Sequence, residues 1–131
     1  MVNNDYIQTI GMPGVFGMAA VADLAVKKGY TVYYLTGRPE TQRDATMRDL
    51  NAAGYPGVST THLFMRNKTA PPAYLPCEPT CTTIQYKSLT RKHIDSTGVR
   101  ITIDVGDQFS DLKGGYAGRT FKVPNPMYYL P

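Results

Sequence analysis

Apolar residues in the first part of the chain change from helical spacing to a strand-like run. They recur on one helical face before Gly29, at Val15, Met18, Ala19, Ala22, Ala25 and Val26. Gly29 suits the end of this helix, because glycine readily adopts the left-handed cap conformation. The aromatic and β-branched run that follows, YTVYYL (30–35), predicts a strand.

A second helix and a second strand are predicted next. Within TGRPETQRDATMRDLNAAG (36–54), Pro39 suits a first helical position and Glu40 favours the positive end of the helix. Gly54 suits the cap at the other end. The short apolar segment THLFM (61–65) then predicts another strand.

The second half of the chain repeats this alternation after a proline-rich loop. The predicted elements are a helix closed by glycine in TIQYKSLTRKHIDSTG (83–98), a strand in RITIDV (100–105) and a short strand in RTFKVPNP (119–126). Strands separated by helices of roughly 10 to 15 residues are typical of a mostly parallel sheet covered by helices. We therefore predict an α/β fold.

Composition narrows the classes of function. A chain of 131 residues is expected to form one domain (1–131) that buries about two-thirds of the surface its unfolded form exposes. The net charge is +4, and Lys and Arg are scattered, with Arg91-Lys92-His93 as the longest cluster. This pattern is too diffuse to indicate a nucleic-acid surface, although it suits anionic substrates. No apolar run approaches the ~18 residues that a membrane span needs, and the first residues do not resemble a signal peptide.

Two carboxylates follow the predicted strand 100–105. In ITIDVGDQFSD (101–111), the β-branched segment leads through a glycine to Asp107 and Asp111, which lie one helical turn apart. Open α/β folds bind ligands at the carboxyl ends of their strands, and a hard divalent cation is the simplest occupant of such a pair. The alternative is an ordinary turn in which an Asp caps a helix.

Two other segments carry groups that bind phosphate. Thr36, Gly37 and Arg38 directly follow the predicted strand 30–35, which places a hydroxyl, a glycine amide and a guanidinium near a helix start. The alternative for this tripeptide is a loop with a surface arginine. Lys87 lies in a predicted helix, where its alternative is a solvated position on the exposed face.

Taken together, these motifs resemble those of a known family. The motifs are T-G-R-P-E (36–40), K-S-x-x-R (87–91) and G-D-Q-F-S-D-L (106–112), followed by G-G and KVPNPMYY (122–129). They are similar to those of the acid phosphatase branch of the haloacid dehalogenase superfamily, which includes class B-like and plant-type enzymes. The resemblance covers nearly the whole chain. It implies a Rossmann-like fold and magnesium-dependent hydrolysis of small-molecule phosphomonoesters through a phosphoaspartyl intermediate.

The resemblance also implies roles for the phosphate-binding residues. Thr36 is similar to the phosphate-binding hydroxyl of the second motif, with Gly37 beside it, and Arg38 is similar to its substrate-facing guanidinium. Lys87 is similar to the lysine that balances charge on the nucleophile and the phosphoryl group. These four residues are the expected substrate-binding set, and Thr36 and Lys87 the expected catalytic residues.

The expected cofactor is Mg²⁺. By resemblance, Asp107 and Asp111 are the metal-binding pair, and their carboxylate oxygens are ligands that this ion prefers. Asp104 lies within the predicted strand and matches no motif position.

The family's first motif, D-x-D-x-T, has no counterpart here. It supplies the nucleophile, a general acid/base and a further metal ligand, and this sequence contains no D-x-D. Asp5 precedes a helix-like segment rather than ending an apolar strand. We therefore expect a chain truncated at its amino end that lacks the first, central strand of the sheet. The rival interpretation is a non-catalytic phosphate-binding or storage-type relative.

Two cysteines lie close together in the proline-rich loop. Cys77 and Cys81, in PCEPTC, are consistent with a disulfide, with free thiols or with a metal site, although His62 and His93 do not complete a zinc pattern. A disulfide agrees with the secreted or extracytoplasmic location that the resemblance implies for the full-length parent.

Overall fold

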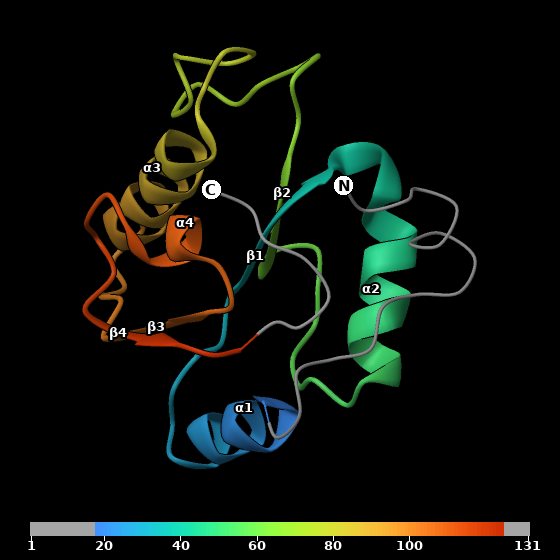
Figure 1. Ribbon diagram of the computed structural model, residues 1–131. Helices are drawn as coiled ribbons and strands as arrows, with labels where there is room; N and C mark the ends of the chain where they lie inside the picture. Colours follow the sequence, from blue (N-terminus) through green and yellow to red (C-terminus); the bar gives the residue numbers. More distant parts are fainter. Residues whose placement is uncertain (1–17, 125–131) are drawn as a thin grey trace. The chain divides into compact units, whose positions relative to one another are not determined.

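The computed structural model describes residues 18–124 of the chain (Figure 1). The chain divides into two compact units, Met1–Met65 and Arg66–Pro131. The described residues form two sheets of two strands each, β1 with β2 and β3 with β4. These short strands and helices make a mixed α/β fold, as predicted, and the single-domain organisation stays a prediction.

The elements of the first part alternate as the sequence predicts. They are α1 (Met18–Lys27), β1 (Tyr34–Pro39), the 3-10 helix η2 (Glu40–Gln42), α2 (Arg43–Ala52) and β2 (Leu63–Arg66). Gly29 and Gly54, predicted to end the two helices, have φ angles of 90° and 85°. This left-handed conformation is easy for glycine only, so both caps are confirmed. Pro39 precedes the helical residues as the N-cap of η2.

Strand β1 begins later than predicted. The sequence pattern placed the strand at residues 30–35, but hydrogen bonding starts where Tyr34 donates its N–H to the carbonyl of His62 (2.8 Å), just before β2. The apolar pattern marks residues that favour a strand, whereas the neighbouring strand decides which of them pair. Thr36, Gly37 and Arg38 consequently lie inside β1 and not after it.

Helix α1 is only partly covered. Its less exposed positions are Met18, Ala19, Ala22 and Ala25, in agreement with the predicted apolar face. Val26, in the last turn of the helix, was predicted on the same face but is 44% exposed. Val15 lies outside the described residues.

The second unit contains a longer helix and a parallel strand pair. Its elements are α3 (Thr83–Ser96), β3 (Ile103–Gly106), α4 (Phe109–Leu112) and β4 (Arg119–Lys122). Helix α3 starts with a capping box between Thr82 and Gln85 and ends before Gly98, as predicted. β3 and β4 run parallel, with Val105 opposite Phe121. Figure 1 shows the two strands side by side with α4 next to them.

Each unit has its own buried side chains. Leu63, Met65 and Ala45 are buried in the first part of the chain, and Leu75, Tyr86 and Ile94 in the second. Residues Tyr86 and Ile94 lie on α3. Their burial fixes the rotation of α3 and therefore which of its polar side chains turn toward α4.

Candidate functional site

Lys87 on α3 forms an ion pair with Asp111 in α4. Lys87 Nζ donates to Asp111 Oδ1, and the two side chains are only 8% and 15% exposed. The other carboxylate oxygen of Asp111 accepts the backbone N–H of Gln108 (2.9 Å). Each oxygen of Asp111 therefore has one partner, which holds the carboxylate in a single orientation. The alternative of a solvated lysine is wrong for Lys87.

A glycine permits the approach of Asp111 to the end of β3. A Cβ placed on Gly106 would lie 2.3 Å from Cβ of Asp111 and 2.7 Å from its Oδ2. No side chain fits at that separation, so any larger residue displaces either the strand end or the carboxylate. Gly106 is therefore needed because it has no side chain that would collide with Asp111, and not because its backbone adopts a positive φ angle.

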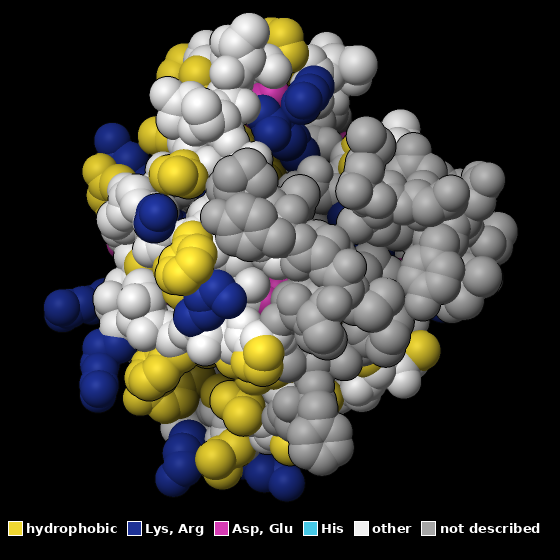
Figure 2. All heavy atoms as spheres, in the orientation of Figure 1, with side chains coloured by type: hydrophobic (Ala, Val, Ile, Leu, Met, Phe, Trp, Pro, Cys, Tyr) yellow, Lys and Arg dark blue, Asp and Glu magenta, His cyan; other side chains and the backbone are white. Residues whose placement is uncertain are grey.

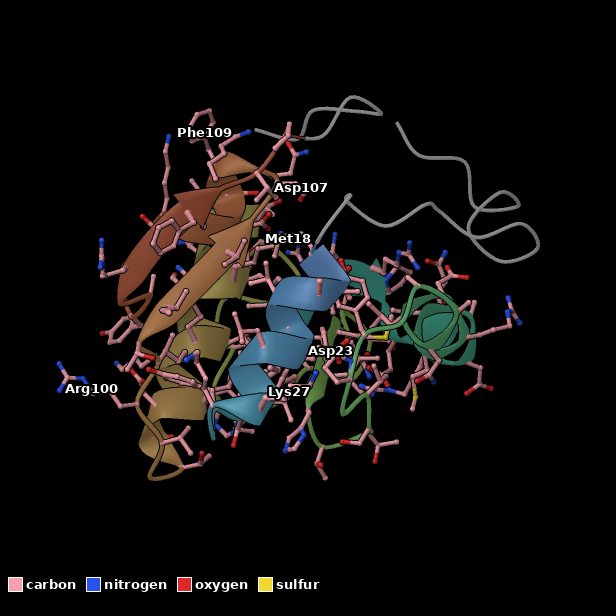
Figure 3. The ribbon with its side chains drawn as sticks, turned by 90° about the horizontal axis from the view of Figure 1, so that it is seen from below. Met18, Asp23, Lys27, Arg100, Asp107 and Phe109 are labelled. Carbon is pink, nitrogen blue, oxygen red and sulfur yellow. A yellow bond between two sulfur atoms is a disulfide. The ribbon has the colours of Figure 1, made fainter. Side chains whose placement is uncertain are left out.

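Asp107 lies directly after β3 and is half-buried. Figure 3 shows Asp107 and Phe109 at one end of the β3–β4 pair and Arg100 at the other end. The N-cap of α4 is Gln108, and Asp111 is the third helical residue, where it completes a capping box. Neither aspartate is the N-cap residue, but Asp111 caps the helix through this box, so the capping alternative is confirmed in part for Asp111.

Asp104, which matches no motif, is a buried carboxyl group on β3. Burial raises its pKa to about 6, while the nearby Arg91 guanidinium lowers it and Asp111 raises it. Oδ2 of Asp104 lies 3.5 Å from Arg91 Nη1 and has no hydrogen-bond partner within residues 18–124. A separation of 3.5 Å is long for a charge-assisted hydrogen bond, so this contact leaves Oδ2 without a hydrogen bond.

The carboxylates fit Mg²⁺ chemically. This ion is commonly held by one or two protein carboxylates and keeps several waters, so carboxylates such as those of Asp107 and Asp111 are ligands of the type it prefers. Each oxygen of Asp111 has a second acceptor position besides its present bond. Within residues 18–124, no group of three or more His, Cys, Asp and Glu side chains is arranged to hold a metal ion.

The predicted phosphate segment lies in β1. The N–H of Arg38 donates to Thr36 Oγ1 (3.2 Å), and Gly37 is exposed with open space around its Cα. Arg38 Nη1 donates to Asp49 (3.1 Å) and to Thr46 (3.2 Å), both on α2. The guanidinium is therefore tied to α2, and the alternative of a surface arginine is wrong for Arg38.

These residues belong to two different units of the chain. Lys87, Asp107 and Asp111 lie in the second unit, and the structure brings Lys87 and Asp111 together. Thr36 and Arg38 lie in the first. Their convergence with Lys87 on one cleft stays a prediction.

Comparison with known proteins identifies the family. A family model described as "HAD superfamily, subfamily IIIB (Acid phosphatase)" matches residues 4–131. The chain belongs to this family. The match covers all of the motifs from which the resemblance was inferred and therefore confirms it.

Three similar relatives come from plants. "Acid phosphatase 1" of Solanum lycopersicum is 37% identical over 106 residues, which are 80% of this chain and 38% of the relative. "Stem 28 kDa glycoprotein" of Glycine max is 34% identical over 80% of this chain and 39% of the relative. "Vegetative storage protein 2" of Arabidopsis thaliana is 31% identical over 81% and 36%. The chain thus spans less than half the length of these relatives.

Solved structures agree on the fold of the family. The class C acid phosphatase from Bacillus anthracis superposes with a TM-score of 0.71 at 21% sequence identity, over 96% of this chain and 54% of that one. The same enzyme with tungstate bound gives a TM-score of 0.70 at 20% identity. At this identity the likeness shows the haloacid dehalogenase-like fold.

Three residues of the quoted motifs have structural roles that the resemblance did not assign. Arg91 is buried and donates to the carbonyl of Asp111, Gln108 holds the Asp111 carboxylate, and Gly106 makes room for it. One signal was available for Arg91, because it lies four residues after Lys87 and so shares its helical face. No sequence pattern indicates the roles of Gln108 and Gly106.

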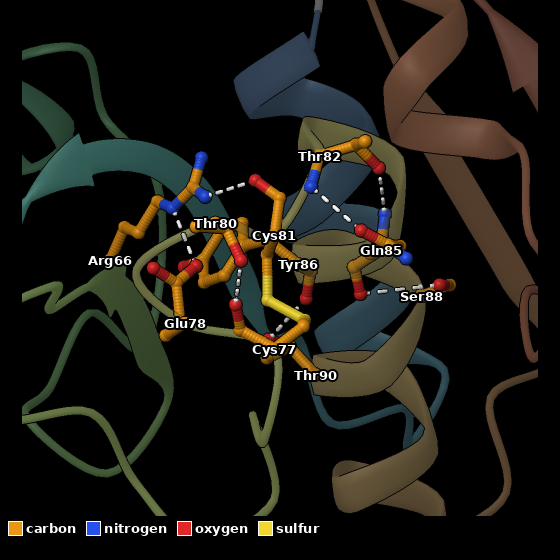
Figure 4. The surroundings of a disulfide bond; sticks show 10 residues. All are labelled: Arg66, Cys77, Glu78, Thr80, Cys81, Thr82, Gln85, Tyr86, Ser88 and Thr90. Carbon is orange, nitrogen blue, oxygen red and sulfur yellow. Dashed lines mark hydrogen bonds and ion pairs between the residues drawn. A yellow bond between two sulfur atoms is a disulfide. The ribbon is translucent and has the colours of Figure 1, made fainter.

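Cys77 and Cys81 form a disulfide, with 4.9 Å between their Cα atoms (Figure 4). The metal and free-thiol alternatives are therefore wrong in this structure. The bridged loop contains Glu78, whose buried carboxylate accepts from Arg66 Nε (2.8 Å), and Arg66 also donates to the carbonyl of Cys81. Because α3 starts at Thr83, the loop anchors the helix that carries Lys87.

Basic side chains are spread over the face of the molecule that Figure 2 draws, where Lys and Arg stand at several separate places. Across residues 18–124, no helix has both the length and the apolar character needed to cross a bilayer.

Proposed function

We propose that this chain carries the phosphate- and metal-binding part of an acid phosphatase that hydrolyses small-molecule phosphomonoesters. Family membership supports phosphatase activity in general. The observation that carries the proposal is the ion pair between Lys87 and Asp111, whose side chain lies against Gly106 at the carboxyl end of β3, the residue that precedes Asp107. In parallel α/β sheets this is the end at which ligands bind.

The proposed chemistry depends on neutralising charge. A phosphoryl group in transfer spreads negative charge over its equatorial oxygens, and the protein acts mainly by positioning and electrostatic stabilisation. The ammonium of Lys87 supplies one positive charge close to the carboxylates. The hydroxyl of Thr36, the amide of Gly37 and the guanidinium of Arg38 supply donors for the other phosphate oxygens. Arg38 uses only Nη1 toward α2, so its remaining N–H groups stay available for phosphate.

Asp107 and Asp111 are the residues that would hold Mg²⁺. The ion, when bound, acts as a Lewis acid on a phosphate oxygen. Lys87 and the N–H of Gln108 orient the Asp111 carboxylate for this role. Asp107 would supply a second carboxylate from the end of β3.

The phosphoaspartyl route needs a carboxylate nucleophile, which the family's D-x-D-x-T motif supplies. This sequence contains no D-x-D, so the proposal assigns the nucleophile to none of its residues. We expect the 131-residue chain alone to show no turnover of an aryl phosphate with magnesium above background. The non-catalytic alternative is not favoured, because the matching family is described as acid phosphatase. A secreted or extracytoplasmic location remains part of the proposal.

Ligand binding by the purified chain tests the proposal. We expect titration calorimetry to detect Mg²⁺ binding that Asp107→Asn abolishes, and inorganic phosphate binding that Lys87→Met weakens at least tenfold. Asp44→Asn is the matched control, because Asp44 is an exposed carboxylate on α2. If both ions bind but neither Asp107→Asn nor Lys87→Met changes their affinities, the proposed site is wrong. It is also wrong if neither ion binds to the unaltered chain. Turnover that is lost in Asp107→Asn would instead show that the chain contains a nucleophile.

A further inference from the structure

Arg91 is a buried arginine on α3 whose guanidinium donates several hydrogen bonds to the backbone. The family resemblance assigned it no role. Its side chain is 3% exposed. Nη1 donates to the carbonyl of Asp111, and Nη2 donates to the carbonyls of Lys113 and Gly115 (2.9 Å), while Nε also donates to Gly115 (3.1 Å). One guanidinium thus binds three backbone carbonyls, one in the last turn of α4 and two in the segment that follows it.

The same segment is held at a second point on α3. A Cβ on Gly114 would lie 2.6 Å from Cβ of Ser88, so the glycine packs directly against the helix. Gly114 also has a φ angle of 95°, which favours glycine over any other residue. Ser88 and Arg91 are three positions apart and lie on neighbouring parts of one helical face. The K-S-x-x-R and G-D-x-x-x-D…G-G motifs therefore interlock.

We infer that Arg91 is a positioning residue for the ion pair between Lys87 and Asp111. By binding the carbonyl of Asp111 and two carbonyls after it, Arg91 fixes the end of α4 against α3. This restricts the backbone of Asp111 to the conformation in which its carboxylate lies beside Lys87. The expected effect of Arg91 on Mg²⁺ binding rests on the proposed function. Its effect on the position of Asp111 does not.

A rigid, planar group with several donors is needed for this role. Arg presents five N–H donors in a fixed fork, whereas the ammonium of Lys is a single point charge on a flexible stem. Arg91→Lys keeps the positive charge facing Asp104 but cannot span the carbonyls of Asp111, Lys113 and Gly115. The Arg91→Lys variant therefore tests the hydrogen bonds to these carbonyls while keeping the positive charge at position 91.

The test is the energetic coupling between Lys87 and Asp111. Urea unfolding of Lys87→Met, Asp111→Asn and the double variant measures this coupling as the deviation of the double variant from additivity. We expect clear coupling in the unaltered chain and its loss when the cycle is repeated with Arg91→Lys. The control background is Arg100→Lys, because Arg100 is exposed and lies at the opposite end of the β3–β4 pair. Coupling that survives Arg91→Lys, or that is absent from the unaltered chain, overturns the inference.

Mg²⁺ binding provides a second readout. Outer residues that orient metal ligands typically change metal affinity by about 10- to 100-fold when replaced. We expect such a loss in Arg91→Lys and none in Arg100→Lys. If the chain binds no Mg²⁺ while the coupling still depends on Arg91, the proposed metal site fails and the positioning role stands. If Mg²⁺ binding depends on Asp107 but neither readout responds to Arg91→Lys, the proposed function stands and the positioning role fails.

Discussion

Lys87 and Asp111 form an ion pair across 24 residues of sequence. Both side chains are largely shielded from solvent, and Asp111 is also held by the backbone of Gln108. Charges that leave water lose hydration energy, which only a well-placed partner returns. The pair therefore links α3 to the end of β3 and gives the chain a measurable electrostatic contact at its candidate site.

Removing one member of this pair should destabilise the chain. Lys87→Met leaves the Asp111 carboxylate buried beside an apolar side chain, so we expect a loss of about 3 kcal/mol in the free energy of unfolding. Urea denaturation measures it. Lys92→Met is the control, because Lys92 is an exposed lysine on the same helix, and surface changes usually stay within about 0.5 kcal/mol. Equal losses for the two variants would contradict the role of the ion pair.

Two glycines in or at the end of strands should respond differently to alanine. Gly106→Ala brings a Cβ to 2.3 Å from Cβ of Asp111, whereas Gly37 has no atom within 4 Å of the position of its Cβ. Overpacking typically costs about 1 to 3 kcal/mol, and we expect that loss for Gly106→Ala only. Thermal unfolding of both variants is the measurement. A Gly37→Ala variant that is as unstable as Gly106→Ala would show that the close approach to Asp111 is not the cause.

The buried carboxyl group of Asp104 should make stability depend on pH. Burial raises its pKa from 3.8 to about 6, so between these values the folded chain binds more protons than the unfolded chain. Stability due to this group therefore falls as the pH rises through this window. A raise of about two units corresponds to at most about 3 kcal/mol.

Asp104→Asn removes this titration. We expect the variant to gain stability relative to the unaltered chain on going from about pH 4 to about pH 7, as measured by urea unfolding at both values. Asp44→Asn serves as the control, because its carboxylate is exposed. A stability difference between the Asp104→Asn variant and the unaltered chain that stays constant over this range would show that Asp104 titrates normally.

The disulfide should contribute modestly to stability. Cys77 and Cys81 are separated by four positions, and closing so short a loop in the unfolded chain corresponds to about 2 kcal/mol. We expect the double variant Cys77→Ser/Cys81→Ser to lose about this amount, and thiol titration of the unreduced chain to detect no free thiol. If addition of a reductant destabilises the serine variant as much as the unaltered chain, the effect does not come from this bridge.

Local patterns were enough to predict several elements of the fold. The spacing of apolar residues and the terminal glycines Gly29, Gly54 and Gly98 predicted three helices with nearly correct ends. This succeeded because helix ends depend on residues that are close in sequence. The three motifs together were also sufficient for the family, since each brings a rare combination of residue types at fixed spacing.

Tertiary structure decided what depends on partners distant in sequence. The start of β1 at Tyr34 follows from its bond to His62, and the burial of Lys87 follows from Asp111. Arg91 and Gly106 have roles that are visible only where the chain after β3 packs on α3. Sequence by itself determined which groups are present and where the three longer helices lie. Only folding decided which charges pair, because a charge leaves water only where the packed chain places a partner beside it.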